Sequence, residues 1–303
     1  MAIVTRITDL FGCRHPFQQA GMGGVETPDL ALAVAAAGGI GMLNADLPAP
    51  LVSSNINAVP ADAAIGINFL VPFLDPSVLE LASAAMPYVE LFWGDPDEAL
   101  VATAHTGGAL AGWQVGSAIE AQAAVDAGCD VVVTQGVEAG GHVRGTTGLL
   151  PLLDEVRAVI DVPIIAAGGI GTGRAMAAAI AAGADAVRVG TRFIAAHEYP
   201  AHPAYVDALI AATAEDTTLT TAFGEGWPDA PHRVLRSAVE AGERLGDAQS
   251  WSPMWPRRHE DGPIEARCLY AGQSVGAVRS RQPAGAIVQE LVDEAERVLA
   301  GPS

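Results

Sequence analysis

The stretch of sequence that decides the fold is 162-VPIIAAGGIGTGR-174, which is followed closely by 184-ADAVRVGTRF-193. Each contains a short apolar run that ends in glycine, and an alanine-rich run over 174–182 lies between them and closes at Gly183. Short apolar runs bounded by glycine predict buried strands, and an alanine-rich run closed by glycine predicts a helix. The stretch therefore predicts two parallel strands joined by a helix.

The same alternation extends back along the chain to residue 16. The strand candidates, in order, are 17–20, 39–44, 64–70, 88–94, 110–116, 130–136, 162–169 and 184–193. Helical runs lie between them, for example over 29–37, 77–85 and 117–127. Eight such units favour a closed (β/α)8 TIM barrel over an open doubly wound sheet. The dinucleotide fingerprint G-x-G-x-x-G is absent, which weakens the open alternative.

After residue 197 the alternation stops. Prolines and tryptophans are frequent over 198–282, with helical pieces expected at 205–213 and 231–241. We interpret 198–282 as a mostly helical insert between the eighth strand and a closing helix over 285–299. Residues 1–197 and 283–303 then form the barrel. An insert at this point covers the C-terminal mouth of a barrel, where it would act as a lid and substrate wall.

Composition excludes several classes of function. The chain carries 35 acidic and 16 basic residues, a formal net charge of −19, and every basic residue is an arginine. Such a charge disfavours nucleic acid and anionic membranes as partners. The lack of lysine excludes Schiff-base aldolases, pyridoxal phosphate enzymes and P-loop NTPases. Three cysteines without a CxxC pair fit neither a disulfide framework nor a thiolate metal cluster, and no metal site is expected.

The chain shows no signal peptide at its N-terminus, MAIVTRITDL, because that segment lacks an apolar core and contains Asp9. The longest nearly uncharged apolar stretch, 30–43, is shorter than the roughly 20 residues that a membrane helix needs. We therefore expect a soluble, cytoplasmic protein. The sequence leaves the oligomeric state open, with a homodimer as one alternative.

Two glycine-rich motifs follow the seventh and eighth predicted strands. The first supplies Ala167, Gly168 and Gly169, and the second supplies Gly190 and Thr191. Barrels commonly bind phosphate between these two loops, where unshielded backbone N–H groups meet a helix N-terminus. The glycines could also serve only tight turns and close helix packing. The pairing of both motifs in these positions favours phosphate binding.

Other polar residues are expected at the same end of the barrel. His142, after the sixth strand, is a candidate general base, whereas we interpret the other six histidines as structural. Met22 lies in a glycine-rich turn after the first strand, and side-chain amides end three strands at Asn68, Gln114 and Gln135. This lining has few charges and suits a neutral heterocycle with a phosphate tail, such as FMN.

Several of these motifs together resemble the nitronate monooxygenase family, formerly called 2-nitropropane dioxygenases. They are QAGMGG (19–24), AGGIG (37–41), GINF (66–69), QGVEAGGHVRG (135–145), IIAAGGI (164–170), VGTRF (189–193) and YAGQSVG (270–276). The likeness spans nearly the whole chain. It implies an FMN-dependent TIM barrel with a helical insert that oxidises alkyl nitronates with O2 to carbonyl compounds and nitrite. A nitronate or nitroalkane and O2 are then the expected partners.

The resemblance also implies site residues. His142 matches the family's active-site histidine, and Gln273 would face the flavin ring. The expected cofactor contacts are Gly21, Met22, Gly23, Asn68, Gln114, Gln135, Gly140, Gly141, Ala167, Gly168, Gly169, Arg188, Gly190, Thr191 and Gln273. Two departures stand out. Gln114 occupies a position where some relatives have lysine, and 229–265 matches the family poorly, so substrate choice does not carry over.

Two alternatives to nitronate oxidation remain at this point. A flavin-dependent enoyl-acyl-carrier-protein reductase shares the barrel, the EAGGH loop and the YAGQ-like segment, and uses NAD(P)H. Acyl carrier protein is acidic, so a chain of net charge −19 would repel it unless arginines cluster. Arg233, Arg236, Arg257 and Arg258 are the candidates for such a cluster. The other alternative is a barrel that binds a flavin or another phosphate ligand without catalysis.

Overall fold

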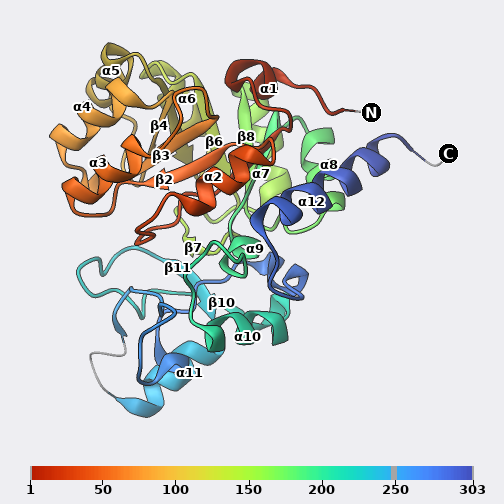
Figure 1. The fold of residues 1–303 in the computed structure, drawn as a ribbon. Helices are drawn as coiled ribbons and strands as arrows, with labels where there is room; N and C mark the ends of the chain where they lie inside the picture. Colours follow the sequence, from red (N-terminus) through yellow and green to blue (C-terminus); the bar gives the residue numbers. More distant parts are fainter. Residues whose placement is uncertain (1, 247–250, 302–303) are drawn as a thin grey trace.

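The computed structural model describes residues 2–246 and 251–301 (Figure 1). The expected barrel boundaries include residues 1, 302 and 303, and the expected insert includes 247–250; these lie outside the described residues. Within the described ranges, no helix combines the length and apolar character needed to cross a membrane.

Eight parallel strands form the barrel. They are β1 (Phe17–Gln19), β2 (Gly41–Asn44), β3 (Ile65–Leu70), β4 (Tyr88–Phe92), β5 (Leu110–Val115), β6 (Val131–Gln135), β8 (Ile164–Ala167) and β9 (Ala186–Val189). The order in the sheet is β1-β9-β8-β6-β5-β4-β3-β2. The two edge strands of this order, β1 and β2, come together and close the barrel. The contact lies just before β2, where the N–H of Gln19 donates to the carbonyl oxygen of Ile40 at 2.9 Å. The predicted TIM barrel is confirmed.

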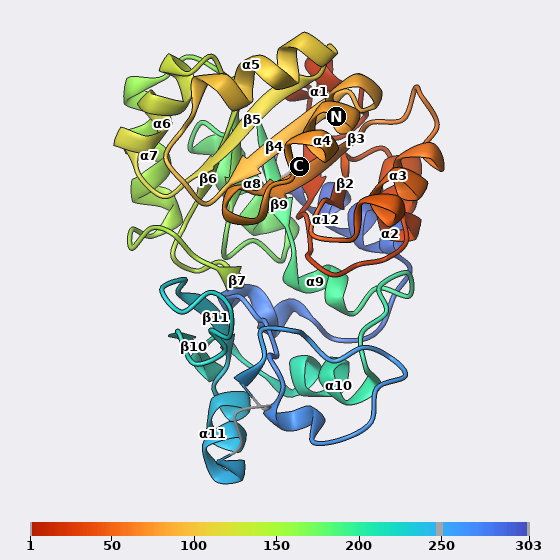
Figure 2. The ribbon, with the colours of Figure 1, turned by 90° about the vertical axis from the view of Figure 1, so that its left-hand side faces the viewer.

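Helices cover the outside of the strands (Figure 2). They are α2 (Asp29–Ala36), α3 (Ala49–Asn57), α4 (Pro76–Ala85), α5 (Glu98–Gly107), α6 (Ala118–Asp126), α7 (Leu149–Val159), α8 (Gly173–Ala181) and α12 (Ala284–Leu299). Local sequence sets several of their ends. Ser117 and Thr172 accept backbone N–H groups at the starts of α6 and α8. Gly128 and Gly183 follow those helices with φ of 97° and 102°, a conformation that favours glycine.

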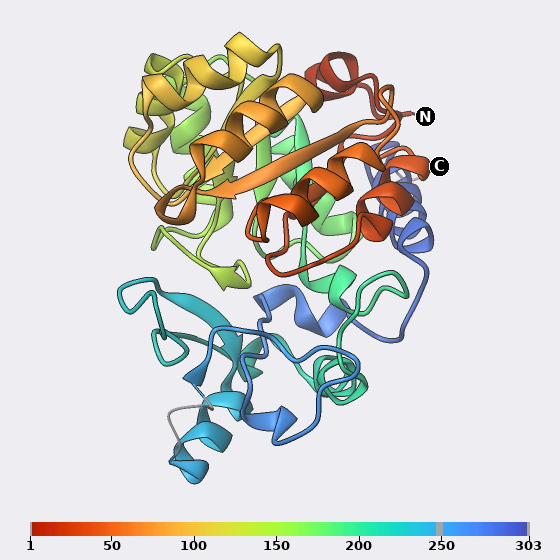
Figure 3. The same cartoon turned by 60° about the vertical axis from the view of Figure 1, so that its left-hand side comes forward.

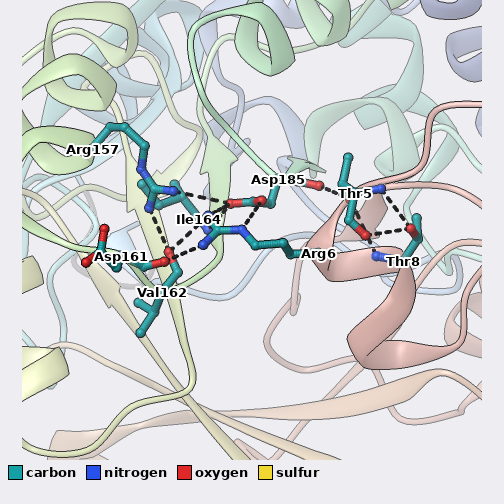
Figure 4. A network of polar contacts seen from close by, with 8 residues as sticks. All are labelled: Thr5, Arg6, Thr8, Arg157, Asp161, Val162, Ile164 and Asp185. Atoms are coloured by element: carbon teal, nitrogen blue, oxygen red, sulfur yellow. Dashed lines mark hydrogen bonds and ion pairs between the residues drawn. The ribbon is translucent and has the colours of Figure 1, made fainter.

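The N-terminal end of the barrel is closed by α1 (Arg6–Phe11). Its Ile7 is fully buried and packs with apolar strand residues, among them Val131 and Ile165. Asp185 holds this helix in place, because Arg6 donates to both of its carboxylate oxygens at 2.7 and 2.6 Å (Figure 4). The opposite end of the barrel is thus the open one.

The segment after β9 lies at the end of the barrel opposite α1 (Figure 3). It contains α9 (Thr191–Ile194), α10 (Pro203–Ala211), β10 (Thr217–Thr220), β11 (His232–Leu235) and α11 (Arg236–Leu245). Short 3-10 turns are η1 (Val71–Phe73) in the barrel and η2 (Ala214–Asp216), η4 (Ile264–Ala266) and η5 (Gln273–Ala277) in this segment. A strand from a barrel loop, β7 (Gly141–His142), pairs with β11 in a small sheet of order β10-β11-β7.

Two expected elements differ from the structure. The helix expected over 231–241 begins only at Arg236, because 232–235 is fully buried and pairs with β10 and β7 as a strand. Tertiary pairing here overrides the local helical pattern. The eighth strand ends at Val189 rather than at 193, because Gly190 takes helical backbone angles and Thr191 begins α9.

Candidate functional site

A cavity of about 430 Å³ lies at the carboxyl ends of the barrel strands. Barrel loops line one side of it, and the segment after β9 lines the other. The structure brings nearly all predicted site residues to this cavity. They are Gly21, Met22, Gly23, Asn68, Gln114, Gln135, Gly140, Gly141, His142, Ala167, Gly168, Gly169, Arg188, Gly190 and Thr191.

Gln273 is the predicted residue that does not line the cavity. Its side chain is exposed, and its backbone N–H donates to the carbonyl oxygen of Glu138 at 2.9 Å. The next residue, Ser274, lines the cavity instead. Gln273 is the first residue of η5. The main chain of Gln273 anchors the loop that carries Gly140 and Gly141, and the side-chain amide of Gln273 is not part of the lining.

Glycines form the part of the cavity beside β8 and β9. Gly168 and Gly169 have φ of 103° and 70°, which a residue with a Cβ rarely adopts. A Cβ at Gly168 would also lie 2.9 Å from the carbonyl oxygen of Gly136. Among the hydrogen bonds of the described residues, none uses the N–H of Gly168, Gly169 or Gly190. These unpartnered donors, from two neighbouring loops on one cavity, fit a phosphate group.

The floor of the cavity contains a buried ion pair. Arg188 of β9 is 6% exposed and pairs with Glu90 of β4, which is fully buried. Its guanidinium also donates to Oε1 of Gln114 at 2.6 Å and to Oε1 of Gln18 at 2.7 and 2.9 Å. Asn68 donates to the other oxygen of Glu90 at 2.8 Å. The predicted amides Asn68 and Gln114 are thus oriented by this pair.

The ion pair supplies a positive charge near Gln114, a position at which this chain departs from the family pattern. Gln114 replaces a lysine found in some relatives, yet the guanidinium of Arg188 contacts Gln114 directly. A fixed positive charge is therefore present beside that position, supplied from β9. Sequence reasoning missed Gln18 and Glu90, although a glutamate in the apolar strand 88-YVELF-92 is a detectable signal.

His142 lies on β7, directly opposite His232 of β11. Gln135 fixes its main chain, because the Gln135 amide donates to the carbonyl oxygen of His142 at 2.9 Å. The imidazole is surrounded by rings, with centroid distances of 4.3 Å to Trp227, 5.4 Å to His232 and 5.7 Å to Trp93. Such an enclosure shields much of the half-buried imidazole from water.

Burial and, to a smaller extent, the nearby His232 together lower the pKa of His142 to about 3. The imidazole is therefore neutral at physiological pH. In that form it can donate one hydrogen bond and accept another, but it is a weak base. Trp93, one of the enclosing rings, has a φ of 67°, a strained backbone conformation for a bulky residue.

Aromatic residues line the other side of the cavity. A substrate wall was expected in 198–282, where tryptophans are frequent. The aromatic residues that line this side of the cavity are Tyr199, Tyr205, Trp227, Trp255 and Tyr270. A compositional signal could have found them. Aromatic residues make up only 5% of the chain, yet three of its four tyrosines are in this set. Concentrated aromatics in an aromatic-poor chain indicate a binding surface.

Within the described ranges, no three His, Cys, Asp or Glu side chains gather as a metal site would require. The three cysteines Cys13, Cys129 and Cys268 are buried and free, and burial raises the pKa of the Cys13 thiol to about 11. The ionisable side chains that line the cavity are instead Asp46, Arg188, Glu225, His142 and three tyrosines.

Solved structures with the same architecture include FabK from Thermotoga maritima. That chain is 29% identical, superposes with a TM-score of 0.87, and the match covers 98% of both chains. A nitroalkane oxidase from Streptomyces ansochromogenes is 30% identical with a TM-score of 0.77, over 98% of this chain and 99% of that one. Both likenesses extend over the barrel and the segment after β9.

Sequence relatives carry several names. A 5-hydroxy-7a-methyl-1-oxo-octahydro-1H-indene-4-carboxyl-CoA dehydrogenase of Rhodococcus jostii is 34% identical over 77% of this chain, which spans 66% of that relative's length. A nitronate monooxygenase of Pseudomonas aeruginosa is 32% identical, over 78% of this chain and 82% of the relative. The model of the nitronate monooxygenase family matches residues 4–86 and 75–294. The chain therefore belongs to the nitronate monooxygenase family, whose relatives named here are oxidoreductases.

Proposed function

We propose that the protein is an FMN-dependent enzyme that oxidises alkyl nitronates with O2 to a carbonyl compound and nitrite. The observation that carries the proposal is the position of His142. Its imidazole lies in a ring-lined part of the same cavity that the glycines Gly168, Gly169 and Gly190 line with unpartnered N–H groups. A histidine at this place is an ionisable group that mere ligand binding would not need.

The chain's own residues fit FMN. The N–H groups of Gly168, Gly169 and Gly190 would hold its phosphate. The backbone of Gly21, together with Met22, Asn68 and Gln114, would lie along its ring. These residues would hold FMN, which would supply the electron transfer between the nitronate and O2.

The neutral imidazole suits a nitronate better than a nitroalkane. A nitronate is already an anion, so its oxidation requires no base, and an N–H of His142 would orient its nitro oxygens. Removal of the α-proton from a neutral nitroalkane needs a base of higher pKa than the value of about 3 that burial gives His142. We therefore expect nitronates to be much better substrates than the corresponding nitroalkanes.

The proposal is tested with purified protein. It should be yellow, release FMN on denaturation and consume O2 when a nitronate is added. His142→Asn should lower turnover and keep the flavin, because the N–H groups proposed to hold the phosphate belong to the loops after β8 and β9, whereas His142 lies on β7. Protein that is colourless and cannot be reconstituted with FMN would end the proposal. An undiminished His142→Asn enzyme would remove only the role of the histidine.

The likeness to FabK keeps the enoyl-acyl-carrier-protein reductase as a second candidate. The four arginines that would attract an acidic carrier protein each make contacts within the fold, and of the four only Arg236 and Arg258 are exposed. Arg233 is 6% exposed and donates to the carbonyl oxygen of Val137, and Arg257 pairs with Glu26. Arg236 and Arg258 donate to backbone carbonyl oxygens of separate segments. This arrangement favours nitronate oxidation over the second candidate.

One comparison separates the candidates. NADH oxidation stimulated by a crotonyl thioester, without nitronate-dependent O2 uptake, would favour the reductase. Bound FMN that neither nitronates nor NAD(P)H reduce would favour a binding protein without catalysis.

A further inference from the structure

Three aromatic residues of the cavity wall formed after β9 have their polar atoms hydrogen-bonded within the protein. The hydroxyl of Tyr205 donates to the carbonyl oxygen of Tyr270 at 2.6 Å. The hydroxyl of Tyr270 donates to the carbonyl oxygen of Pro253 at 3.0 Å. The indole N–H of Trp255 donates to the carbonyl oxygen of Gly23 at 2.8 Å. Because these polar groups are already satisfied, the rings offer a ligand mainly apolar surface.

The charges on the cavity are unfavourable for a second anionic group. Among the described lining residues, the charged side chains are Asp46, Glu225 and Arg188. Arg188 is 6% exposed, and its donors are used by Gln18, Gln114 and Glu90. Asp46 and Glu225 are exposed, and no ion pair of the described residues includes either of them. A free carboxylate in the cavity would therefore meet two anions and no available cation.

The apolar wall reaches the histidine itself. The indole of Trp227 lies 4.3 Å from the imidazole of His142, with ring planes tilted by 32°. Trp227 also contacts Phe73 at a centroid distance of 5.1 Å. A substrate whose reacting group approaches His142 must place the rest of its skeleton against these rings.

We infer that the substrate has an uncharged hydrocarbon skeleton whose single anionic group is the reacting nitronate, and that the enzyme discriminates against a second carboxylate. The inference rests on the proposed function and names the substrate class of the same site. A carboxylate on the skeleton would lose hydration against the rings, or else lie near Asp46 and Glu225. Either position weakens binding.

The test compares two nitronates of matched shape. Propionate 3-nitronate carries a carboxylate, and 3-methylbutyl 1-nitronate carries an isopropyl group in its place. With the flavin-loaded enzyme, we expect kcat/KM to be higher for the alkyl nitronate by about tenfold or more, as one unfavourable desolvation or like-charge contact produces. Glu225→Gln should reduce this ratio by about threefold, because it removes one exposed negative charge at the cavity.

The matched control is Glu243→Gln, which removes the same charge from the exposed side of α11, away from the cavity. It should leave the ratio unchanged. Equal or better oxidation of propionate 3-nitronate would overturn the inferred substrate class while leaving the proposed function intact. A ratio that Glu225→Gln and Asp46→Asn both fail to move would overturn the role of these charges. Oxidation of neither nitronate would contradict the proposed function itself.

Discussion

Arg188 shows how one buried side chain can organise a site. It lies on the last barrel strand, yet its guanidinium reaches Gln18 of β1, Glu90 of β4 and Gln114 of β5. A buried charge is tolerated only when it is paired and hydrogen-bonded, and both conditions hold here. The pair therefore fixes the side chains at the floor of the cavity.

Removing one partner should be costly. Glu90→Gln leaves the guanidinium of Arg188 without its counter-charge inside the barrel, and we expect the free energy of unfolding to fall by about 3 kcal/mol. Asp95→Asn is the matched control, because Asp95 is 96% exposed and pairs with Arg144 at the surface. That change should cost less than about 1 kcal/mol. Urea denaturation of both variants measures the difference. Equal losses in the free energy of unfolding would contradict a larger contribution from the buried pair than from the surface pair.

His142 should couple stability to pH. Its pKa is about 3 in the folded protein and near its ordinary value of 6.5 in the unfolded chain. Between these values the unfolded chain binds the extra proton, so stability falls as the pH drops below 6.5. Between pH 7.5 and 5.5 the histidine should account for a loss of about 1.4 kcal/mol. The His142→Asn variant should lose that much less over the same interval; an identical loss would contradict the depressed pKa.

The residues of the site were largely predictable, because glycine pairs and side-chain amides at strand ends leave a recognisable pattern. Gln273 was placed at the flavin ring by resemblance, but the 3-10 turn that begins there brings Ser274 to the cavity instead. Glu90 was missed because its role appears only when Arg188, 98 residues away, is folded against it. The glutamate in the apolar run 88–92 is a local signal of a buried charge, but nothing in that run identifies Arg188 as its partner.

At the scale of elements, α1 is held to the barrel by one carboxylate. Asp185 accepts from Arg6 and from the backbone N–H of Ile164 at 2.9 Å, and Arg157 lies 3.7 Å from it (Figure 4). The hydrogen bond with Asp185 raises the pKa of Arg6 above its ordinary value. The helix, the strand β8 and the helix α7 thus meet at this side chain.

Asp185→Asn should loosen this end of the barrel. The amide cannot accept from both Arg6 nitrogens and the Ile164 N–H at once, so we expect a loss of about 2 kcal/mol in the free energy of unfolding. Asp161→Asn is the control, since Asp161 contributes only its backbone carbonyl oxygen to the hydrogen bond with Arg6. Thermal unfolding measured at the same ionic strength should separate the two variants. No difference between them would contradict the role of the carboxylate.

Element type was predictable where the local pattern and the tertiary environment agree. All eight barrel strands occur where the alternation of apolar and helical runs placed them. The agreement failed at 232–235, where pairing with β7 and β10 makes a strand of residues whose local pattern is helical. It also failed at Gly190, which ends a strand that the apolar run would have continued. In both cases a distant contact or a backbone turn decided the outcome.

At the scale of the whole molecule, the barrel and the segment after β9 contribute different chemistry to one cavity. The barrel supplies backbone N–H groups, amides and the buried Arg188–Glu90 pair, and the later segment supplies aromatic rings. One of the contacts between them is the β7–β11 pairing, which places His142 where the two parts meet. In the proposed function, this division of roles lets a polar reacting group and an apolar skeleton bind in the same space.

The most direct test is anaerobic mixing of the flavin-loaded protein with an alkyl nitronate and, separately, with NADH, while the flavin absorbance near 450 nm, roughly the usual band of an oxidised flavin, is followed. The nitronate should bleach the band, and admitting O2 should restore it with formation of nitrite. NADH should leave it nearly unchanged. Bleaching by NADH alone, with no response to the nitronate, would contradict the account.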